Sequence, residues 1–182
     1  MKCLATSRDG RFELRPPETE HEWERYHSIR ERVLWRGLKS LQEFGPYDRD
    51  HPEQYGADYM PLVLIRNGIV TGTLGLQDMG EHGRGREVEV RAVAVEPACQ
   101  GQGYGGIMLM MADCLAGRAG YKRAGVWSNS DAVLYYARNG YTHRSPEHPP
   151  RLECPVPGAV PMAKRLDLGM AQNDGSVLIA AA

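Results

Sequence analysis

The chain has 182 residues, of which 42% are hydrophobic and 25% charged, as expected for an ordinary globular protein with one core. Lys and Arg total 22 against 23 for Asp and Glu, and a net charge of -1 gives no general attraction to nucleic acid or to an anionic membrane. No apolar run is long enough to span a bilayer, and charged residues stand where a signal peptide needs its apolar core, so we expect a cytoplasmic protein. The four cysteines lie far apart and the six histidines lack metal-ligand spacing, so no metal site is expected.

The first third of the sequence predicts a short strand, a helix and a loop. Phe12 to Arg15 alternates in polarity and stops at two prolines, as a strand does. Thr19 and Glu22 form a capping-box pattern that opens an amphipathic helix to about Trp35. A weaker helix is expected over Gly37 to Glu43, and the acidic, glycine- and proline-containing stretch Phe44 to Tyr59 is interpreted as a loop.

The middle of the chain predicts an antiparallel hairpin followed by a long strand. Two apolar runs, Pro61 to Arg66 and Ile69 to Leu76, are joined by Asn-Gly, which favours a two-residue turn. A second turn over Gly80 to Gly85 leads into a strand from Arg86 to Val95. Strict alternation would divide the side chains of this strand between the two faces of the sheet. One face would carry Glu87, Glu89, Arg91, Val93 and Val95, and the other Val88, Val90, Ala92 and Ala94.

A glycine-rich loop follows that strand and precedes a helix, an arrangement that suits phosphate because bare N–H groups and a helix N-terminus converge on the anion. A Walker loop is excluded, since Gly106-Ile107 replaces Gly-Lys-[Ser/Thr]. The dinucleotide fingerprint is matched literally by Gly101, Gly103 and Gly106, but the next strand lacks the acidic residue that would hold a ribose. The third pattern, [Gln/Arg]-x-x-Gly-x-[Gly/Ala], is matched in full by Gln100 to Gly105.

Beyond the loop, the pattern predicts alternating helices and strands. The helix Gly103 to Gly117 is apolar around much of its surface and should be central, and the strand Arg123 to Trp127 should run parallel to the preceding strand. The remaining expected elements are a helix over Asp131 to Asn139 capped by Gly140, a proline-rich loop over Ser145 to Gly158, and a strand over Ala159 to Leu166. Residues 167–182 form a tail, or an edge strand at Val177 to Ala180 on this sheet or on a partner's in a homodimer.

The loop together with Asn129, Ala132, Tyr136, Gly140 and Tyr141, which follow Asn-x-x-Ala-x-x-x-Tyr-x-x-x-Gly-[Phe/Tyr], resembles the GNAT superfamily of N-acetyltransferases. The resemblance is strong from about Pro61 to Leu166. It implies one α/β domain over residues 1–182, with a core at about 11–166 and a splayed central mixed sheet flanked by helices. It also implies acetyl-CoA as co-substrate, an amine of a small molecule or a protein as acceptor, and direct transfer in a ternary complex.

The resemblance also implies roles for particular residues. Glu89 matches a general base, with Glu87 in reserve. Two alternatives for this role stay open: the family often uses a water chain as its base, and either glutamate could simply form an ion pair with Arg91 or Arg86. Tyr136 matches the tyrosine that protonates or holds the CoA sulfur. The expected cofactor-binding residues are Val93, Ala94, Val95, Gln100, Gly101, Gln102, Gly103, Tyr104, Gly105, Gly106, Asn129 and Tyr136. Two alternatives stay open, a transferase using a longer acyl-CoA and a non-catalytic CoA-binding module.

Overall fold

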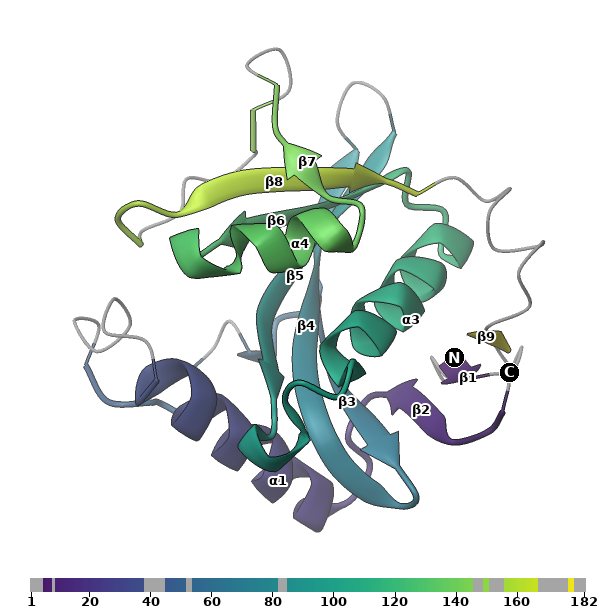
Figure 1. Cartoon of the computed structure of the whole chain (residues 1–182), viewed down its shortest axis with the longest axis vertical. Helices are drawn as coiled ribbons and strands as arrows, with labels where there is room; N and C mark the ends of the chain where they lie inside the picture. Colours follow the sequence, from purple (N-terminus) through teal and green to yellow (C-terminus); the bar gives the residue numbers. More distant parts are fainter. Residues whose placement is uncertain are drawn as a thin grey trace.

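A computed structural model describes residues 5–7, 9–37, 45–51, 54–81, 85–145, 149–150, 156–166 and 177–178 of the chain. These residues form a nine-stranded mixed sheet in the order β7-β8-β6-β5-β4-β3-β2-β1-β9 (Figure 1). The strands are β1 (Ala5–Ser7), β2 (Phe12–Arg15), β3 (Tyr59–Arg66), β4 (Ile69–Glu81), β5 (Arg86–Val95), β6 (Arg123–Ser128), β7 (Thr142–His143), β8 (Val160–Arg165) and β9 (Val177–Leu178). Strands β5 and β6 pair in parallel, as the sequence predicts, and the other neighbouring strands pair antiparallel.

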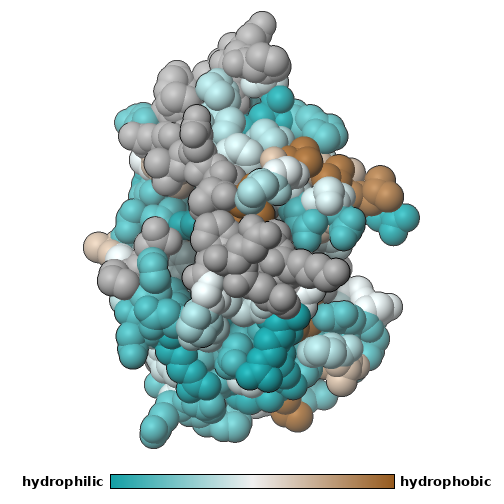
Figure 2. All heavy atoms as spheres, turned by 90° about the vertical axis from the view of Figure 1, so that its left-hand side faces the viewer, coloured by the Kyte–Doolittle hydropathy of each residue, from teal (hydrophilic) through white to brown (hydrophobic). Residues whose placement is uncertain are grey.

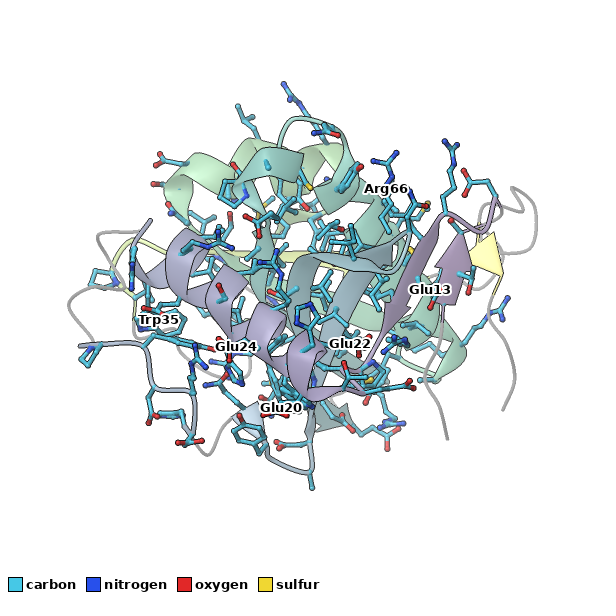
Figure 3. The ribbon with its side chains drawn as sticks, turned by 90° about the horizontal axis from the view of Figure 1, so that it is seen from below. Glu13, Glu20, Glu22, Glu24, Trp35 and Arg66 are labelled. Atoms are coloured by element: carbon cyan, nitrogen blue, oxygen red, sulfur yellow. The ribbon has the colours of Figure 1, made fainter. Side chains whose placement is uncertain are left out.

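Helices cover both faces of this sheet, which lies between α1 on one side and α3 and α4 on the other (Figure 3). The helical segments are α1 (Glu20–Arg30), the π-helix η1 (Glu31–Trp35), the 3-10 turn η3 (Pro97–Cys99), α3 (Tyr104–Arg118), the 3-10 turn η4 (Ser130–Ala132) and α4 (Val133–Arg138). None of the helices in the described ranges is long and apolar enough to cross a membrane.

The capping box confirms the predicted start of α1. Thr19 accepts a hydrogen bond from the Glu22 N–H, and the Glu22 carboxylate accepts one from the Thr19 N–H. Glu22 also accepts two hydrogen bonds from Arg15 of β2, so the cap attaches the helix to the sheet. The run continues to Trp35 as predicted, but its last five residues are π-helical, with the Arg36 N–H donating to the Glu31 carbonyl. Figure 3 shows Glu20 and Trp35 toward opposite ends of this helical run.

The β3–β4 hairpin turns at the predicted Asn-Gly pair. Asn67 and Gly68 both have positive φ, 50° and 77°, as a two-residue type I′ turn requires. Strand β4 runs on to Glu81, so Gly80 belongs to the strand and not to the predicted second turn.

Two hydrophobic clusters hold the helices on the sheet. The larger lies under α3 and α4 and includes Leu74, Val88, Met108, Leu109 and Tyr141, so the central position predicted for the apolar helix is confirmed. The smaller lies under α1 and η1, where Tyr26, Ile29 and Leu34 pack on Val63, Ile65 and Ala94. Among the residues drawn in colour in Figure 2, those on the lower part of this side of the molecule are mostly hydrophilic, as expected for a helix with one face in the core.

Strand β5 does not alternate strictly, and the prediction that Val93 and Val95 share a face with Glu87, Glu89 and Arg91 is wrong. The register shifts between the pairs Gly75–Arg91 and Thr73–Ala94, and Ala92 has a φ of 51°. This β-bulge inserts one residue and reverses the phase of the alternation. Val93 and Val95 therefore pack on the α3 cluster with Val88 and Val90, and Ala92 and Ala94 pack on the α1 side.

The edges of the sheet hold strands that the sequence did not predict. Strands β1 and β7 are only three and two residues long. Strand β9 coincides with the predicted edge strand and pairs with β1 of its own chain. All of the predicted helix over Gly37 to Glu43 except Gly37, and most of the proline-rich loop over Ser145 to Gly158, lie outside the described residues.

Candidate active site

The two central parallel strands separate part-way along their length. Pairing between β5 and β6 is confined to the pairs Glu87–Arg123, Val88–Ala124 and Glu89–Gly125. Beyond these pairs β6 stays with β8 and β5 stays with β4, so the sheet opens between them (Figure 1). The second half of β5 therefore presents an unpaired backbone edge to this opening.

The direction of one hydrogen bond indicates which β5 groups face the opening. The Glu96 N–H donates to the Thr71 carbonyl at the β4 side, 2.9 Å away. Because successive N–H groups of an extended strand point to alternate sides, the N–H groups of Val95 and Val93 point away from β4. They are available to a molecule lying where β6 has diverged.

The glycine-rich loop connects the end of β5 to α3 at the same opening. Gly101 and Gly103 have φ values of 72° and 82°, a conformation that glycine adopts without strain. The N–H groups of Cys99, Gln100 and Ile107 donate to backbone carbonyls. Among the described residues, none accepts a hydrogen bond from the six consecutive N–H groups of Gly101 to Gly106. Such a run of free donors at a helix N-terminus is typical of an anion-binding site.

The loop side chains hold the loop in shape. The side-chain amide of Gln100 donates to the Val95 carbonyl, and that of Gln102 donates to the Ala98 carbonyl, each at 2.9 Å. Both bonds stay within the loop and the end of its strand, so these glutamines stabilise its conformation and leave the backbone donors free. A Cβ added to Gly105 would lie 2.7 Å from the Tyr135 hydroxyl, which shows how closely α4 approaches the loop.

Glu89 and Glu87 differ in their charged neighbours. Glu89 is 8% exposed, and burial raises the pKa of its carboxyl above the ordinary value, while Arg91, 3.6 Å away, acts in the opposite direction. Glu87 is ion-paired with the buried Arg144 and lies 4.0 Å from Arg123. The two carboxylates therefore differ in their contacts, since Glu87 is engaged by the Arg144 guanidinium, whereas the nearest cation that pairs with Glu89 is Arg91. The predicted alternative pairing with Arg91 exists for Glu89, whereas Arg86 pairs with Asp78.

Tyr136 lies in the core on the α3 side, 7% exposed, with its ring centroid 5.7 Å from that of Tyr141. Burial raises the pKa of its hydroxyl well above the ordinary value, so Tyr136 is protonated at neutral pH. Its hydroxyl has no hydrogen-bond partner among the described residues. The neighbouring hydroxyl of Tyr135 is sealed from solvent and likewise lacks a partner.

Asn129 begins the short turn η4 after β6. Its side-chain oxygen accepts from the Asp131 N–H at 3.2 Å and so caps this turn. The residue therefore shapes the β6 side of the opening.

Arg144 was not singled out by the sequence analysis. Its guanidinium occupies the space over Gly125 of β6, where any side chain would overlap it. The pairing with Glu87 joins positions 57 residues apart, and no local pattern signals such a contact. Within the described ranges no group of three or more His, Cys, Asp or Glu side chains is placed to hold a metal ion.

A parallel pair of strands that splays beside a glycine-rich helix N-terminus defines the acyl-CoA N-acyltransferase class of fold. Residues 58–143 match the family described as "Acetyltransferase (GNAT) domain". The chain is therefore similar to the GNAT acetyltransferase family over residues 58–143, the part that holds the glycine-rich loop and the Asn129 to Tyr141 spacing.

Solved structures support the same fold assignment. N-acetylglutamate synthase from Neisseria gonorrhoeae, complexed with coenzyme A and N-acetyl-glutamate, is 17% identical with a TM-score of 0.66; the match covers 86% of this chain and 35% of that one. The GNAT domain of S. lividans PAT is 22% identical over 90% of this chain and 96% of that one, with a TM-score of 0.63. PaiA N-acetyltransferase from Thermoplasma acidophilum, in complex with coenzyme A, is 15% identical over 85% and 98%, with a TM-score of 0.62.

Proposed function

We propose that this protein transfers the acetyl group of acetyl-CoA to a primary amine by direct attack in a ternary complex. The observation that carries the proposal is the run of six unpaired N–H groups from Gly101 to Gly106 beside the open edge of β5. The loop would hold the CoA diphosphate, and the Val95 N–H would pair with the pantetheine arm as an added strand does. The complexes of relatives with coenzyme A support this reading.

Glu89 is the proposed general base. A primary amine has a pKa of about 10, so only about one molecule in a thousand is an unprotonated nucleophile at neutral pH. A carboxylate whose pKa is raised by burial is a better proton acceptor than an exposed one. Glu89 lies on β5 four residues before Val93, whose N–H would stabilise the oxyanion formed when the amine attacks the thioester.

Tyr136 is the proposed acid. When the tetrahedral intermediate collapses, the carbon–sulfur bond breaks and the thiolate takes a proton. Tyr136 keeps its proton at neutral pH, and its hydroxyl is not engaged by the described part of the chain. Asn129, which caps η4, would line the pantetheine side of the opening.

Titration with acetyl-CoA tests the loop directly. We expect saturable heat in calorimetry, and slower hydrogen exchange of the amides from Gly101 to Gly106, because these N–H groups lack protein acceptors before the diphosphate binds. Amides of β4, already paired on both sides, serve as the internal control. A titration that gives no heat and no protection of this segment from hydrogen exchange would rule out the proposal.

Replacing Tyr136 with Phe is expected to lower kcat by about 10- to 100-fold with little change in acetyl-CoA affinity, because the hydroxyl acts as the leaving thiolate forms. Tyr135→Phe is the matched control, since it removes an adjacent hydroxyl that has no partner and no contact with solvent. We expect Tyr135→Phe to keep kcat and to gain slightly in stability. Thiol release measured with both variants checks this, and equal kcat values for the two variants would exclude Tyr136 as the acid.

The same assay distinguishes the proposed function from the two alternative functions. A transferase that uses a longer acyl group would release thiol faster from that acyl-CoA than from acetyl-CoA. A CoA-binding module without turnover would give heat on titration and no thiol release with any amine.

A further inference from the structure

Arg30 is a buried cation at the end of α1. It is 5% exposed, and its guanidinium lies 4.9 Å from the centroid of the Tyr26 ring. Its Nη1 group donates to the hydroxyls of Tyr26 and Tyr59, at 2.8 and 3.1 Å. Its Nε–H is sealed from solvent and has no acceptor. The side chain is therefore held in a fixed position with one buried donor unused.

No carboxylate of the described residues neutralises this charge. The neighbouring groups are phenols, which accept hydrogen bonds but stay neutral, since burial raises the pKa of both Tyr26 and Tyr47. The nearby His27 stays neutral as well, because burial and the charges of Arg30 and Arg49 lower its pKa. The equally buried Arg144, in contrast, has Glu87 as its partner. A buried guanidinium without a counterion is costly, and such groups in proteins are paired or bind an anion.

The position of Arg30 relative to β5 relates it to the proposed chemistry. Tyr59, Gln77 and Glu89 are direct partners across β3, β4 and β5, so their side chains share the α1 face of the sheet. The Tyr59 hydroxyl lies over Gly75, where a side chain would overlap it, and Gly75 pairs with Arg91. Glu89 lies two residues from Arg91 on β5. With neighbouring strands about 5 Å apart and a rise of about 3.3 Å per residue along a strand, the guanidinium is roughly 10 Å from Glu89. One small molecule can reach both groups.

The backbone at Arg30 is also unusual. The α-helix ends at this residue and the chain continues as the π-helix η1 over Glu31–Trp35. Short π-helical segments are rare and frequently mark functional sites. Glu96 holds this part of the helix against the end of β5 through Arg25 and Arg32, each at 2.7 Å.

We propose that Arg30, supported by Tyr26 and Tyr59, binds a carboxylate of the acceptor, so that the acceptor is an amino acid and not a simple amine. This inference rests on the proposed acetyl transfer. The carboxylate would accept from the guanidinium beside the Tyr26 and Tyr59 hydroxyls, and the amine of the same molecule would point toward Glu89 and the open edge of β5. The subsite selects among amines by charge, because an acceptor without a carboxylate leaves the guanidinium uncompensated.

Matched acceptors test the proposal in the thiol-release assay. L-leucine is compared with 3-methylbutylamine, and L-phenylalanine with phenethylamine, since each pair differs by the carboxylate. We expect the wild type to use the amino acids with a higher kcat/KM than the matched amines. Arg30→Gln should raise the KM for the amino acids by about 10- to 100-fold with kcat close to wild type. For the amines that lack a carboxylate, both parameters should stay close to wild type. Arg49→Gln is the control, since Arg49 is an exposed arginine paired with Glu24, and it should behave as wild type.

Two further measurements keep the test decisive. Tyr59→Phe keeps the ring and removes one acceptor of Arg30, so it serves if Arg30→Gln does not fold, and it should raise the same KM values by a smaller factor. Titration of the wild type with acetate and glutarate, followed by the NMR resonance of the Arg30 Nε–H, measures carboxylate binding at Arg30 without turnover. A saturable shift of this resonance with no thiol release would support the carboxylate site and contradict the proposed acetyl transfer. Thiol release with equal use of amines and amino acids, and no shift of Arg30, would overturn the inference alone.

Discussion

Glu89→Gln is expected to lower kcat/KM for amine acetylation by about 100-fold or more, because the substitution keeps the shape of the side chain and removes its ability to accept a proton. The pH profile should change with it. In the wild type, activity falls as the pH drops through the raised pKa of Glu89, since the base must be ionised. In the variant only the ionisation of the amine itself should remain. Unchanged rates across the pH range would remove Glu89 from the mechanism.

The same substitution should stabilise the fold at neutral pH. The pKa of Glu89 is raised by burial, so the fold favours the protonated form. Such a group adds stability below its unfolded pKa, and this contribution is lost as the pH rises through the folded pKa. At pH 7 the buried carboxylate is therefore a cost that glutamine does not carry. We expect thermal unfolding to give a higher Tm for the variant at pH 7 and a smaller difference in acid.

Glu87→Gln is the matched control, since it makes the same chemical change two residues earlier on the same strand. Glu87 is paired with Arg144, and both side chains are almost fully buried. Removing one partner leaves an uncompensated buried charge, which costs about 3–5 kcal/mol. Glu87→Gln should therefore lower Tm, in the opposite direction to Glu89→Gln. A higher Tm for Glu87→Gln would contradict this division of roles between the two carboxylates.

Local patterns in the sequence predicted the framework of the fold. Asn67-Gly68 requires positive φ at both positions and fixed the β3–β4 hairpin. Gly140, with a φ of 86°, ends the region of α4 where the sequence placed a helix cap. The loop from Gln100 to Gly105 was recognised from its glycines and from the change from strand to helix. Each of these signals depends on residues adjacent in the chain.

The features that were missed depend on contacts between distant residues. No glycine marks the position of the bulge at Ala92, so the sequence does not indicate it. The bulge places Val93 and Val95 on the face opposite to the one predicted. The choice between Glu87 and Glu89 depends on Arg144, which is far away in the sequence. Arg30 lies among the charged residues of an amphipathic helix, where solvent exposure is the normal expectation, and only the tertiary structure shows it buried.

Gly101→Asp is expected to weaken acetyl-CoA binding by at least about 100-fold. The φ of Gly101 is 72° and no heavy atom lies within 4 Å of an added Cβ, so an aspartate, which tolerates this conformation better than most residues, fits without displacing its neighbours. Its carboxylate would face the diphosphate. Like charges about 5 Å apart repel by roughly 3 kcal/mol at an effective dielectric constant of 20, which corresponds to about two orders of magnitude in Kd. Calorimetric titration with acetyl-CoA measures this loss.

Gly10→Asp separates the electrostatic effect from the cost of the backbone conformation. Gly10 has a φ of 69° and open space around it, almost the same local environment as Gly101, but it lies in the turn between β1 and β2. Both variants should lose about the same 1–2 kcal/mol of stability, since a non-glycine residue is strained at this φ. Only Gly101→Asp should lose affinity for acetyl-CoA, and raising the salt concentration should restore part of that affinity because salt screens the repulsion. Equal affinities in the two variants would mean that the diphosphate binds elsewhere, because a negative charge placed among six free N–H donors cannot leave an anion bound there unaffected.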